Sequence, residues 1–312
     1  MNFYFAPMEG LTGYIYRNAH NAFFNNTIDK YFSPFIVANQ SKSFKTKELN
    51  DILPENNQGL ILIPQLLTNN AKDFINTSNK LIQLGYDQIN LNLGCPSGTV
   101  VAKNRGAGFL SKLEELDAFL DEIFSCSGAK ISVKTRIGRD QPEEFYKLIE
   151  IFNKYPMEEL IIHPRIQKDF YNNKPNLKIF KEALTLSKNP VCYNGDIFTV
   201  KDYKDFTEGF GSVDKMMIGR GLITNPGLIN SITSSIKLEK ELLKHFHDKI
   251  YQDYRQILSG DRNVLYKMKH IWTYMIQMFS NSEKYAKKIR KAERLTDYDL
   301  AVLSLFREQD IV

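Results

Sequence analysis

The sequence predicts an α/β protein, a (β/α)8 TIM barrel followed by a C-terminal all-α helical bundle. Eight short apolar segments alternate with amphipathic helical segments, at intervals of roughly 29 residues. Strand signals stop after residue 233. A doubly wound open sheet, the alternative, would usually carry a glycine-rich phosphate loop after its first strand, and that position reads APMEGLTG instead. These three observations favour the barrel.

The expected strands are runs of apolar or β-branched residues. Between them, apolar side chains recur with a helical period over residues 70–86, 112–127 and 141–155. Parallel βα units of this kind close into a barrel. We place the strand starts near residues 2, 30, 59, 88, 130, 159, 189 and 215.

After residue 233 only helical periodicity remains. No low-complexity linker separates this region from the barrel. We therefore expect a catalytic barrel domain over residues 1–233 and a helical domain over residues 234–312. The helices of the second domain are expected at 237–258, 263–279, 282–295 and 296–306.

The composition is that of an ordinary water-soluble globular protein, with 312 residues, 43% hydrophobic and 25% charged. No apolar run approaches the ~20 residues of a membrane-spanning helix, and the first residues lack the basic region of a signal peptide. The cysteines Cys95, Cys126 and Cys192 form no CxxC pair, so we expect neither a disulfide framework nor a metal site. We expect a cytoplasmic monomer that does not contact membranes.

Positive charge is concentrated near the C-terminus. Residues 234–312 hold 15 Lys and Arg against 11 Asp and Glu, whereas residues 1–233 hold 26 against 25. A solvated helical surface is the simpler interpretation of such a segment. A more specific interpretation is a face that binds a polyanion.

Polar residues interrupt most of the expected strands near their C-terminal ends, where TIM barrels carry their chemistry. Each one alone has a structural explanation, such as a satisfied core histidine. Together they indicate a site, because burying so many polar groups costs folding energy unless they meet a ligand. The set comprises Gln65, Asn92, Lys134, Arg136, His163, Arg165, Asn194, Asp196 and Arg220.

Two glycine turns, YNGDI and IGRGLITNPG, follow the last two expected strands. Either turn alone is explained by a tight connection. The adjacent Arg220 favours a phosphate site, which TIM barrels commonly place here. With Lys134, Gln65 and His163 available to a polar ring system, the pattern describes a site for flavin mononucleotide (FMN).

The segments APMEGLTG, PQLLTNN, INLNLGCPSGTVVAKNRGAGFL, VKTR, IIHPR, NGDI and MIGRGLITNPG together resemble the tRNA-dihydrouridine synthases. They occur in the family's order over about residues 4–230. The resemblance implies an enzyme that reduces the C5–C6 double bond of specific uridines in tRNA. FMN would carry the hydride, with NADPH or NADH as reductant.

The resemblance also assigns roles to individual residues. Cys95 would be the general acid that protonates C5, a role that suits a thiol, because it is mostly protonated at neutral pH. The base would contact Asn92, Arg136 and Tyr171. The cofactor would contact Pro7, Met8, Gln65, Lys134, His163, Asn194, Gly195, Asp196, Gly219 and Arg220.

The basic helical region fits the need to grip tRNA while one base is swung into the barrel. The cations expected to contact RNA are Lys103, Arg105, Lys267, Lys269, Lys287, Lys288, Arg290, Lys291 and Arg294. Trp272 is expected in the core of the helical domain. One departure from the family is HPR in place of HGR, which removes the backbone N–H at residue 164.

Two other functions stay open from the sequence. One is a flavin-dependent TIM-barrel reductase of a free small molecule, a pyrimidine or an enone. The other is a non-catalytic RNA-binding protein with a vestigial barrel, against which the intact Cys95, Lys134, Arg136 and His163 argue. The sequence does not specify which uridine is reduced or which nicotinamide is used.

Overall fold

The computed structural model describes residues 1–39 and 43–312. Its strands form one parallel sheet in the order β3-β5-β6-β7-β8-β9-β10-β1-β2-β4. The strands are β1 (Asn2–Phe5), β2 (Lys30–Phe32), β3 (Ile36–Val37), β4 (Leu62–Ile63), β5 (Gln65–Leu67), β6 (Gln88–Leu93), β7 (Lys130–Gly138), β8 (Leu160–Ile166), β9 (Val191–Tyr193) and β10 (Lys215–Ile218).

The sheet closes on itself as a barrel. The second and third expected strands are each split in two, into β2 and β3 and into β4 and β5. β3 pairs with β5 at one end of the strand order, and β2 pairs with β4 at the other end. Both ends are therefore halves of the second and third barrel strands, and the sheet closes there. Pro34 and Pro64 stand at the breaks, where a residue without an N–H interrupts the ladder. The predicted (β/α)8 barrel is confirmed.

Helices surround the barrel, and those predicted at 70–86, 112–127 and 141–155 are present as α3, α5 and α6. The helices of this part are α1 (Tyr14–Phe23), α2 (Thr46–Ile52), α3 (Ala71–Gln83), α4 (Gly98–Val101), α5 (Leu113–Cys126), α6 (Glu144–Phe152), α7 (Leu177–Leu186), α8 (Val200–Gly209), α9 (Arg220–Thr224) and α10 (Leu228–Thr233).

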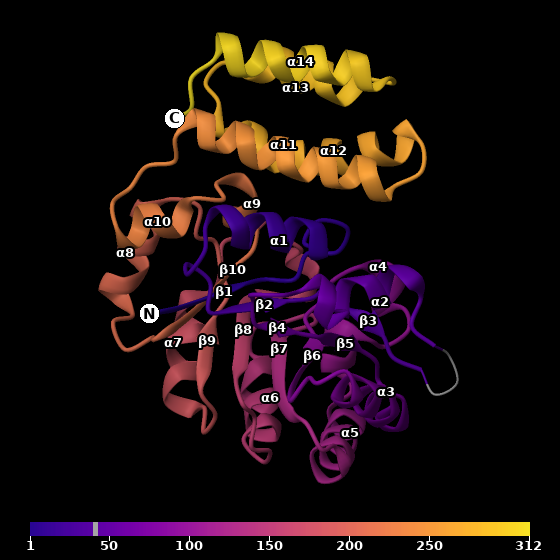
Figure 1. Ribbon diagram of the computed structural model, residues 1–312. Helices are drawn as coiled ribbons and strands as arrows, with labels where there is room; N and C mark the ends of the chain where they lie inside the picture. Colours follow the sequence, from indigo (N-terminus) through magenta and orange to yellow (C-terminus); the bar gives the residue numbers. More distant parts are fainter. Residues whose placement is uncertain (40–42) are drawn as a thin grey trace.

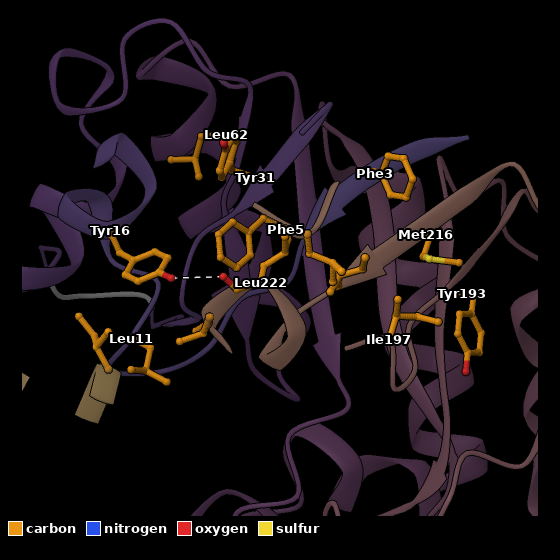
Figure 2. Close-up of a cluster of buried hydrophobic side chains, with 14 of the residues drawn as sticks. Phe3, Phe5, Leu11, Tyr16, Tyr31, Leu62, Tyr193, Ile197, Met216 and Leu222 are labelled. Carbon is orange, nitrogen blue, oxygen red and sulfur yellow. Dashed lines mark hydrogen bonds between the residues drawn. The ribbon is translucent and has the colours of Figure 1, made fainter. Parts of the chain in front are cut away.

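Side chains of β1 alternate between two apolar clusters. Tyr4, and Ala6 just after the strand, belong to a small buried cluster with Cys192 and Met217, whereas Phe3 and Phe5 join the large cluster shared with the helices. Alternation of this kind is expected of a barrel strand. Figure 2 shows part of the large cluster, in which the Tyr16 hydroxyl donates to the carbonyl oxygen of Leu222 on α9.

The C-terminal region is helical, as predicted, with α11 (Lys240–Ile257), α12 (Asp261–Met275), α13 (Glu283–Lys291) and α14 (Leu295–Glu308). Figure 1 shows α11 and α12 lying over α1, with α13 and α14 in a further layer. Phe246 of α11 packs edge-on against Tyr16 of α1, with ring centroids 5.5 Å apart. Trp272 is buried and donates to the Tyr298 hydroxyl at 2.8 Å, so its predicted core position is confirmed.

None of the helices in the described residues is both long enough and apolar enough to span a membrane.

Candidate active site

A cleft opens at the C-terminal ends of the strands and consists of two adjoining hollows. The larger has a volume of about 240 Å³ and the smaller about 50 Å³. Both are bordered by Pro7, Met8, Lys134, His163 and Tyr171. The structure brings together all residues expected to bind cofactor or base. Gln65, Asn92, Cys95 and Arg136 line the larger hollow, and Asn194, Gly195, Asp196, Gly219 and Arg220 line the smaller.

Cys95 lies on a turn that is held from several sides. The Asn92 Oδ1 accepts the N–H of Gly94 at 3.0 Å and that of Cys95 at 2.9 Å. The Ala107 N–H donates to the Cys95 carbonyl oxygen at 3.1 Å. Gly106 has φ 55°, and a Cβ there would lie 2.9 Å from the same oxygen. The RGAGFL segment therefore packs on the cysteine turn because Gly106 has no side chain.

The Cys95 thiol is protonated at neutral pH. Burial raises its pKa, an effect larger than the opposing influence of the Ser97 backbone N–H and of the charges on Arg136 and Lys134. The other two cysteines lie elsewhere: Cys192 is fully buried in β9, and Cys126 is exposed at the end of α5. Of the three, Cys95 alone borders the cleft.

A chain of side-chain amides crosses the barrel interior behind the cysteine turn. Asn92 donates to Gln65 at 2.7 Å, Gln65 donates to Asn90 at 2.7 Å, and Asn90 donates to the Ser132 hydroxyl at 2.9 Å. The two asparagines come from the same face of β6, because alternate strand residues share a face. The sequence prediction missed Asn90 and Ser132, although the INLNL alternation carries the signal. These bonds fix the orientation of Asn92 and Gln65.

Arg136 is buried, and its guanidinium is engaged with the backbone. It donates to the carbonyl oxygens of Gly94 at 2.9 Å, Ile166 at 2.7 Å and Phe170 at 2.7 Å. Phe170 has φ 48°, a left-handed conformation that is strained for a bulky residue. Arg136 therefore ties the cysteine turn to the loop after β8. Its expected contact with the base stays a prediction.

Lys134 differs from its neighbours because it has no hydrogen bond or ion pair with any residue in the described parts of the chain. Burial, and then the charge of Arg136, lower its pKa to about 8. The side chain borders both hollows. A partly desolvated ammonium without a partner is suited to an anionic ligand.

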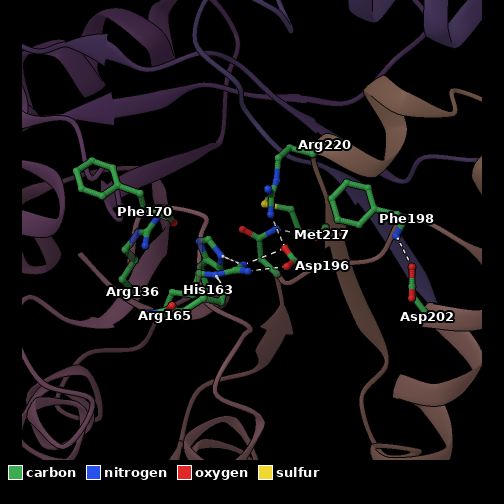
Figure 3. Close-up of polar contacts among 11 residues, drawn as sticks. Arg136, His163, Arg165, Phe170, Asp196, Phe198, Asp202, Met217 and Arg220 are labelled. Carbon is green, nitrogen blue, oxygen red and sulfur yellow. Dashed lines mark hydrogen bonds and ion pairs between the residues drawn. The ribbon is translucent and has the colours of Figure 1, made fainter. Parts of the chain in front are cut away.

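A charged network supports the smaller hollow (Figure 3). Arg165 binds Asp196 through two hydrogen bonds of 2.9 and 2.5 Å, and Arg220 binds the same carboxylate at 2.5 Å. Arg165 also donates to His163 Nε2 at 3.0 Å. Burial and the surrounding cations lower the His163 pKa well below its usual range, so the ring is neutral. The sequence placed Arg165 at a strand end without a role, and its pairing appears only in the structure.

The glycines of the two turns are required by packing. A Cβ at Gly195 would lie 1.9 Å from the Tyr193 hydroxyl oxygen, and one at Gly221 would lie 2.0 Å from the Ile197 carbonyl oxygen. Gly195 and Gly219 border the smaller hollow beside Arg220. Their backbone is therefore open to a ligand at the place where the sequence predicts a phosphate.

The HPR segment forms an irregularity in β8. Arg136 pairs with His163 and Gly138 with Ile166, so β8 has one more residue than β7 between these positions. A proline is tolerated at such a bulge. The following loop brings Tyr171 over the guanidinium of Arg220, with the ring centroid 4.4 Å away. Tyr171 thus borders the cleft as expected, although its contact with the base stays a prediction.

The expected RNA-binding cations fall into three groups. Lys103 and Arg105 lie beside the cysteine turn, where Arg105 donates to Asn69 at 3.3 Å. Lys267 donates to the Gly10 carbonyl oxygen at 3.0 Å and Lys269 to that of Ala292, so both connect parts of the protein. The third group lies on or just after α13. Lys287, Lys288, Arg290 and Lys291 are exposed, and Arg294 is exposed and pairs with Asp297.

Further residues of the cleft were not predicted, and two of them come from the helical region. His270 and Tyr274 of α12 border the larger hollow together with Cys95. Their four-residue spacing could have suggested a shared helix face, but nothing in the sequence places that face over the barrel. Within residues 1–39 and 43–312, no group of three or more His, Cys, Asp or Glu side chains could hold a metal ion.

Solved structures with a similar fold include the following two. Morphinone reductase in complex with tetrahydroNAD matches with a TM-score of 0.53 and 9% identity, over 76% of this chain and 88% of that chain. The old yellow enzyme homologue from Zymomonas mobilis matches with a TM-score of 0.53 and 10% identity, over 78% and 92%. At such low identity the likeness shows the fold alone. That fold is the parallel barrel described above.

The dihydrouridine synthase family model matches residues 4–308, and the chain belongs to that family. The tRNA-dihydrouridine(16) synthase of Pseudomonas putida is 29% identical over 231 residues, which cover 72% of this chain and 70% of that protein. The enzyme of the same name from Haemophilus influenzae is 26% identical, over 76% and 77%. A probable tRNA-dihydrouridine synthase of Staphylococcus aureus is 26% identical, over 72% and 69%.

Proposed function

We propose that this protein reduces the C5–C6 double bond of a uridine in tRNA to dihydrouridine, with FMN as hydride carrier and NADPH or NADH as reductant. The observation that carries the proposal is the protonated thiol of Cys95 in the same cleft as the unpartnered Lys134. Membership of the dihydrouridine synthase family supports the reaction, and the names of the relatives support tRNA as the substrate.

The residues of the cleft fit FMN. Lys134 offers an ammonium for the anionic edge of the reduced ring, and Pro7 and Met8 offer an apolar surface for it. Gly195, Gly219 and Arg220 would hold the phosphate. When bound, the flavin supplies the hydride for C6 of uracil. Gln65 and His163 would contact the ring or its ribityl chain, and Asn194 and Asp196 would border the phosphate.

Cys95 would supply the proton that C5 requires. Because burial raises the pKa of the thiol, Sγ keeps its proton until the base arrives. The Ser97 backbone N–H, and after it the charges of Arg136 and Lys134, act to lower this pKa, so they would ease formation of the thiolate that remains after proton transfer. Asn92 and Arg136 would hold the turn in place and present their remaining N–H groups to the base.

The proposal keeps the division of the chain expected from the sequence. Residues 1–233 bind the flavin and the base, and residues 234–312 grip the tRNA. The protein acts as a cytoplasmic monomer. Position 16 is the first uridine to examine, because the relatives from P. putida and H. influenzae carry that number in their names.

The test uses the purified protein. Denaturation should release FMN, and anaerobic reduction with NADPH should bleach the flavin. Reoxidation by tRNA that lacks dihydrouridine, but not by free uracil or cyclohexenone, is the expected result. Reoxidation by the small molecules alone would favour a small-molecule reductase, and a protein that binds tRNA without flavin would be a non-catalytic RNA-binding protein.

The uridine is identified in tRNA from a strain that lacks the gene. Loss of dihydrouridine at position 16 alone is expected. Loss at another position would assign that position instead.

A further inference from the structure

His270 and Tyr274 belong to the C-terminal helical region, yet they border the catalytic cleft. Residues four apart lie on one face of a helix, so α12 presents both side chains to the same space. A Cβ at Gly10, in the loop after β1, would lie 3.5 Å from the His270 ring. The helix also contacts α9, which begins with Arg220. α12 is therefore a wall of the cleft.

These two side chains make no hydrogen bond with any residue that the structure describes, although both are partly buried. Histidines that serve packing in this protein do find partners. His20 contacts the Tyr31 hydroxyl at 2.9 Å and the Pro226 carbonyl oxygen at 3.1 Å, and His247 contacts the Tyr298 hydroxyl at 2.6 Å. His20 and His247 are fully buried, whereas His270 is partly exposed at the cleft, so its ring nitrogens are left for solvent or a ligand there.

Both groups are uncharged near neutral pH. Burial and the charge of Lys267 lower the pKa of His270, and burial raises the pKa of Tyr274. Each can therefore donate one hydrogen bond and accept another without bringing a charge to the cleft. Such groups suit the hydroxyl and phosphate oxygens of a nucleotide.

The same face of α12 continues outward to Tyr266, whose ring centroid lies 6.5 Å from that of His270. Tyr266 is 68% exposed. Together with Arg262, Lys269 and one carboxylate, that of Glu293, it borders a surface hollow of about 450 Å³. An exposed ring beside cations is the arrangement on which proteins stack the bases of single-stranded RNA.

We propose that the α12 stripe, defined as Tyr266, His270 and Tyr274, is the surface along which the tRNA strand enters the catalytic cleft. Tyr266 stacks on a base next to the target uridine. His270 and Tyr274 hydrogen bond to the ribose and phosphate of the target itself. This assignment rests on the proposed function, because it takes tRNA as the substrate.

The experiment separates the two half-reactions in the flavin-loaded protein. The variants are Tyr266→Ala, His270→Ala and Tyr274→Phe, with Thr273→Ala as the matched control. Thr273 is exposed on the same helix, and among the described residues its hydroxyl bonds only to the Lys269 carbonyl oxygen, at 3.1 Å. Flavin content and the rate of reduction by NADPH should stay within about two-fold of wild type for Thr273→Ala. The same two quantities are measured for each stripe variant, so that a change in flavin binding or reduction is separated from a change in the reaction with tRNA.

Reoxidation of the reduced flavin by tRNA should change only in the three stripe variants. The tRNA concentration for half-maximal reoxidation should rise about ten-fold in Tyr266→Ala, the lower range expected for loss of one stacked base. It should rise about two- to ten-fold in His270→Ala and in Tyr274→Phe, the range expected for loss of a hydrogen bond. Thr273→Ala should match wild type. His270→Gln retains a donor and an acceptor and should recover most of the affinity. Equilibrium binding of tRNA, followed by fluorescence anisotropy, should change in parallel.

Wild-type tRNA affinity in all three stripe variants would overturn the assignment. A second result would also overturn the assignment. If His270→Ala loses flavin, His270→Gln recovers it and neither variant changes the tRNA affinity, then His270 has a packing role. If tRNA fails to reoxidise the wild-type protein, the proposed function fails. The anisotropy measurement still tests the stripe in that case.

Discussion

The barrel rim and helix α13 both carry several positive charges, but they hold them in opposite ways. At the rim, Arg136 and Arg165 are buried, and each donates hydrogen bonds to specific carbonyl or carboxylate oxygens. On α13, Lys287 and Lys288 stand in solvent. The positive charges of the rim are therefore held at fixed positions, which suits chemistry at one atom. The positive charges of α13 are not held by fixed partners, which suits attraction to a polyanion.

Position in the fold explains this difference. A buried guanidinium must satisfy its N–H groups within the protein, since unpaired charge in the interior is costly. An exposed lysine is satisfied by water and gains little from any fixed partner. Helix α12 lies between the two regions, with its stripe reaching from an exposed ring to the cleft.

The largest expected effect comes from the rim. Replacing Cys95 with alanine should slow reoxidation of the reduced flavin by tRNA by about 10²–10⁴-fold, the usual contribution of a general acid. Reduction by NADPH should not change. Stopped-flow absorbance of the flavin measures both steps.

Cys126→Ala is the matched control, because Cys126 is exposed at the end of α5 and outside the cleft. It should react as wild type does. A Cys95→Ala protein that reduces tRNA at the wild-type rate would refute the assignment of the acid.

A change on α13 should act through charge alone. Replacing Lys287, Lys288, Arg290 and Lys291 with glutamine should weaken tRNA binding by up to about 10²-fold at low salt. It should also flatten the salt dependence, by about 0.7–0.9 in slope for each phosphate that the helix no longer neutralises. Reduction by NADPH should be unaffected. Binding isotherms at several salt concentrations measure both quantities.

The control neutralises four exposed lysines on the outer side of the barrel, Lys147, Lys178, Lys181 and Lys188. An equal loss of affinity in the two variants would show that only net charge matters. Unchanged binding in the α13 variant would remove α13 from the RNA-binding surface.

The smallest effect concerns Lys134 in the flavin-free protein. Its pKa is about 8 when folded and about 10.4 in an unfolded chain. Between these values the unfolded state binds more protons, so this group makes the folded state more stable as pH rises. Wild type should gain stability over Lys134→Met by up to about 1.4 kcal/mol for each pH unit above pH 8.

Thermal unfolding from pH 7.5 to 10 checks this, as a growing difference of a few degrees between the two proteins. Lys215→Met is the control, since Lys215 lies at the start of β10, away from the cleft. Parallel profiles for wild type and Lys134→Met would show that the Lys134 pKa is not lowered.

Much of the fold and the membership of the site could be predicted from the sequence. Period-two and helical apolar patterns are local, and parallel strands bring their C-terminal ends to one rim, so Cys95, Lys134 and His163 converge as soon as the order of elements is known. The splitting of two strands was not predicted, although Pro34 and Pro64 carry the signal.

What each polar group binds was decided only by the tertiary structure. Asn92 and Arg136 were expected to face the base, and the structure shows both also holding the cysteine turn. Lys267 was expected on the RNA surface, and it bonds to Gly10 in a distant part of the chain. Hydrogen-bond partners and the docking of α12 over the cleft depend on contacts between elements far apart in the chain. A local pattern of residue types does not predict those contacts.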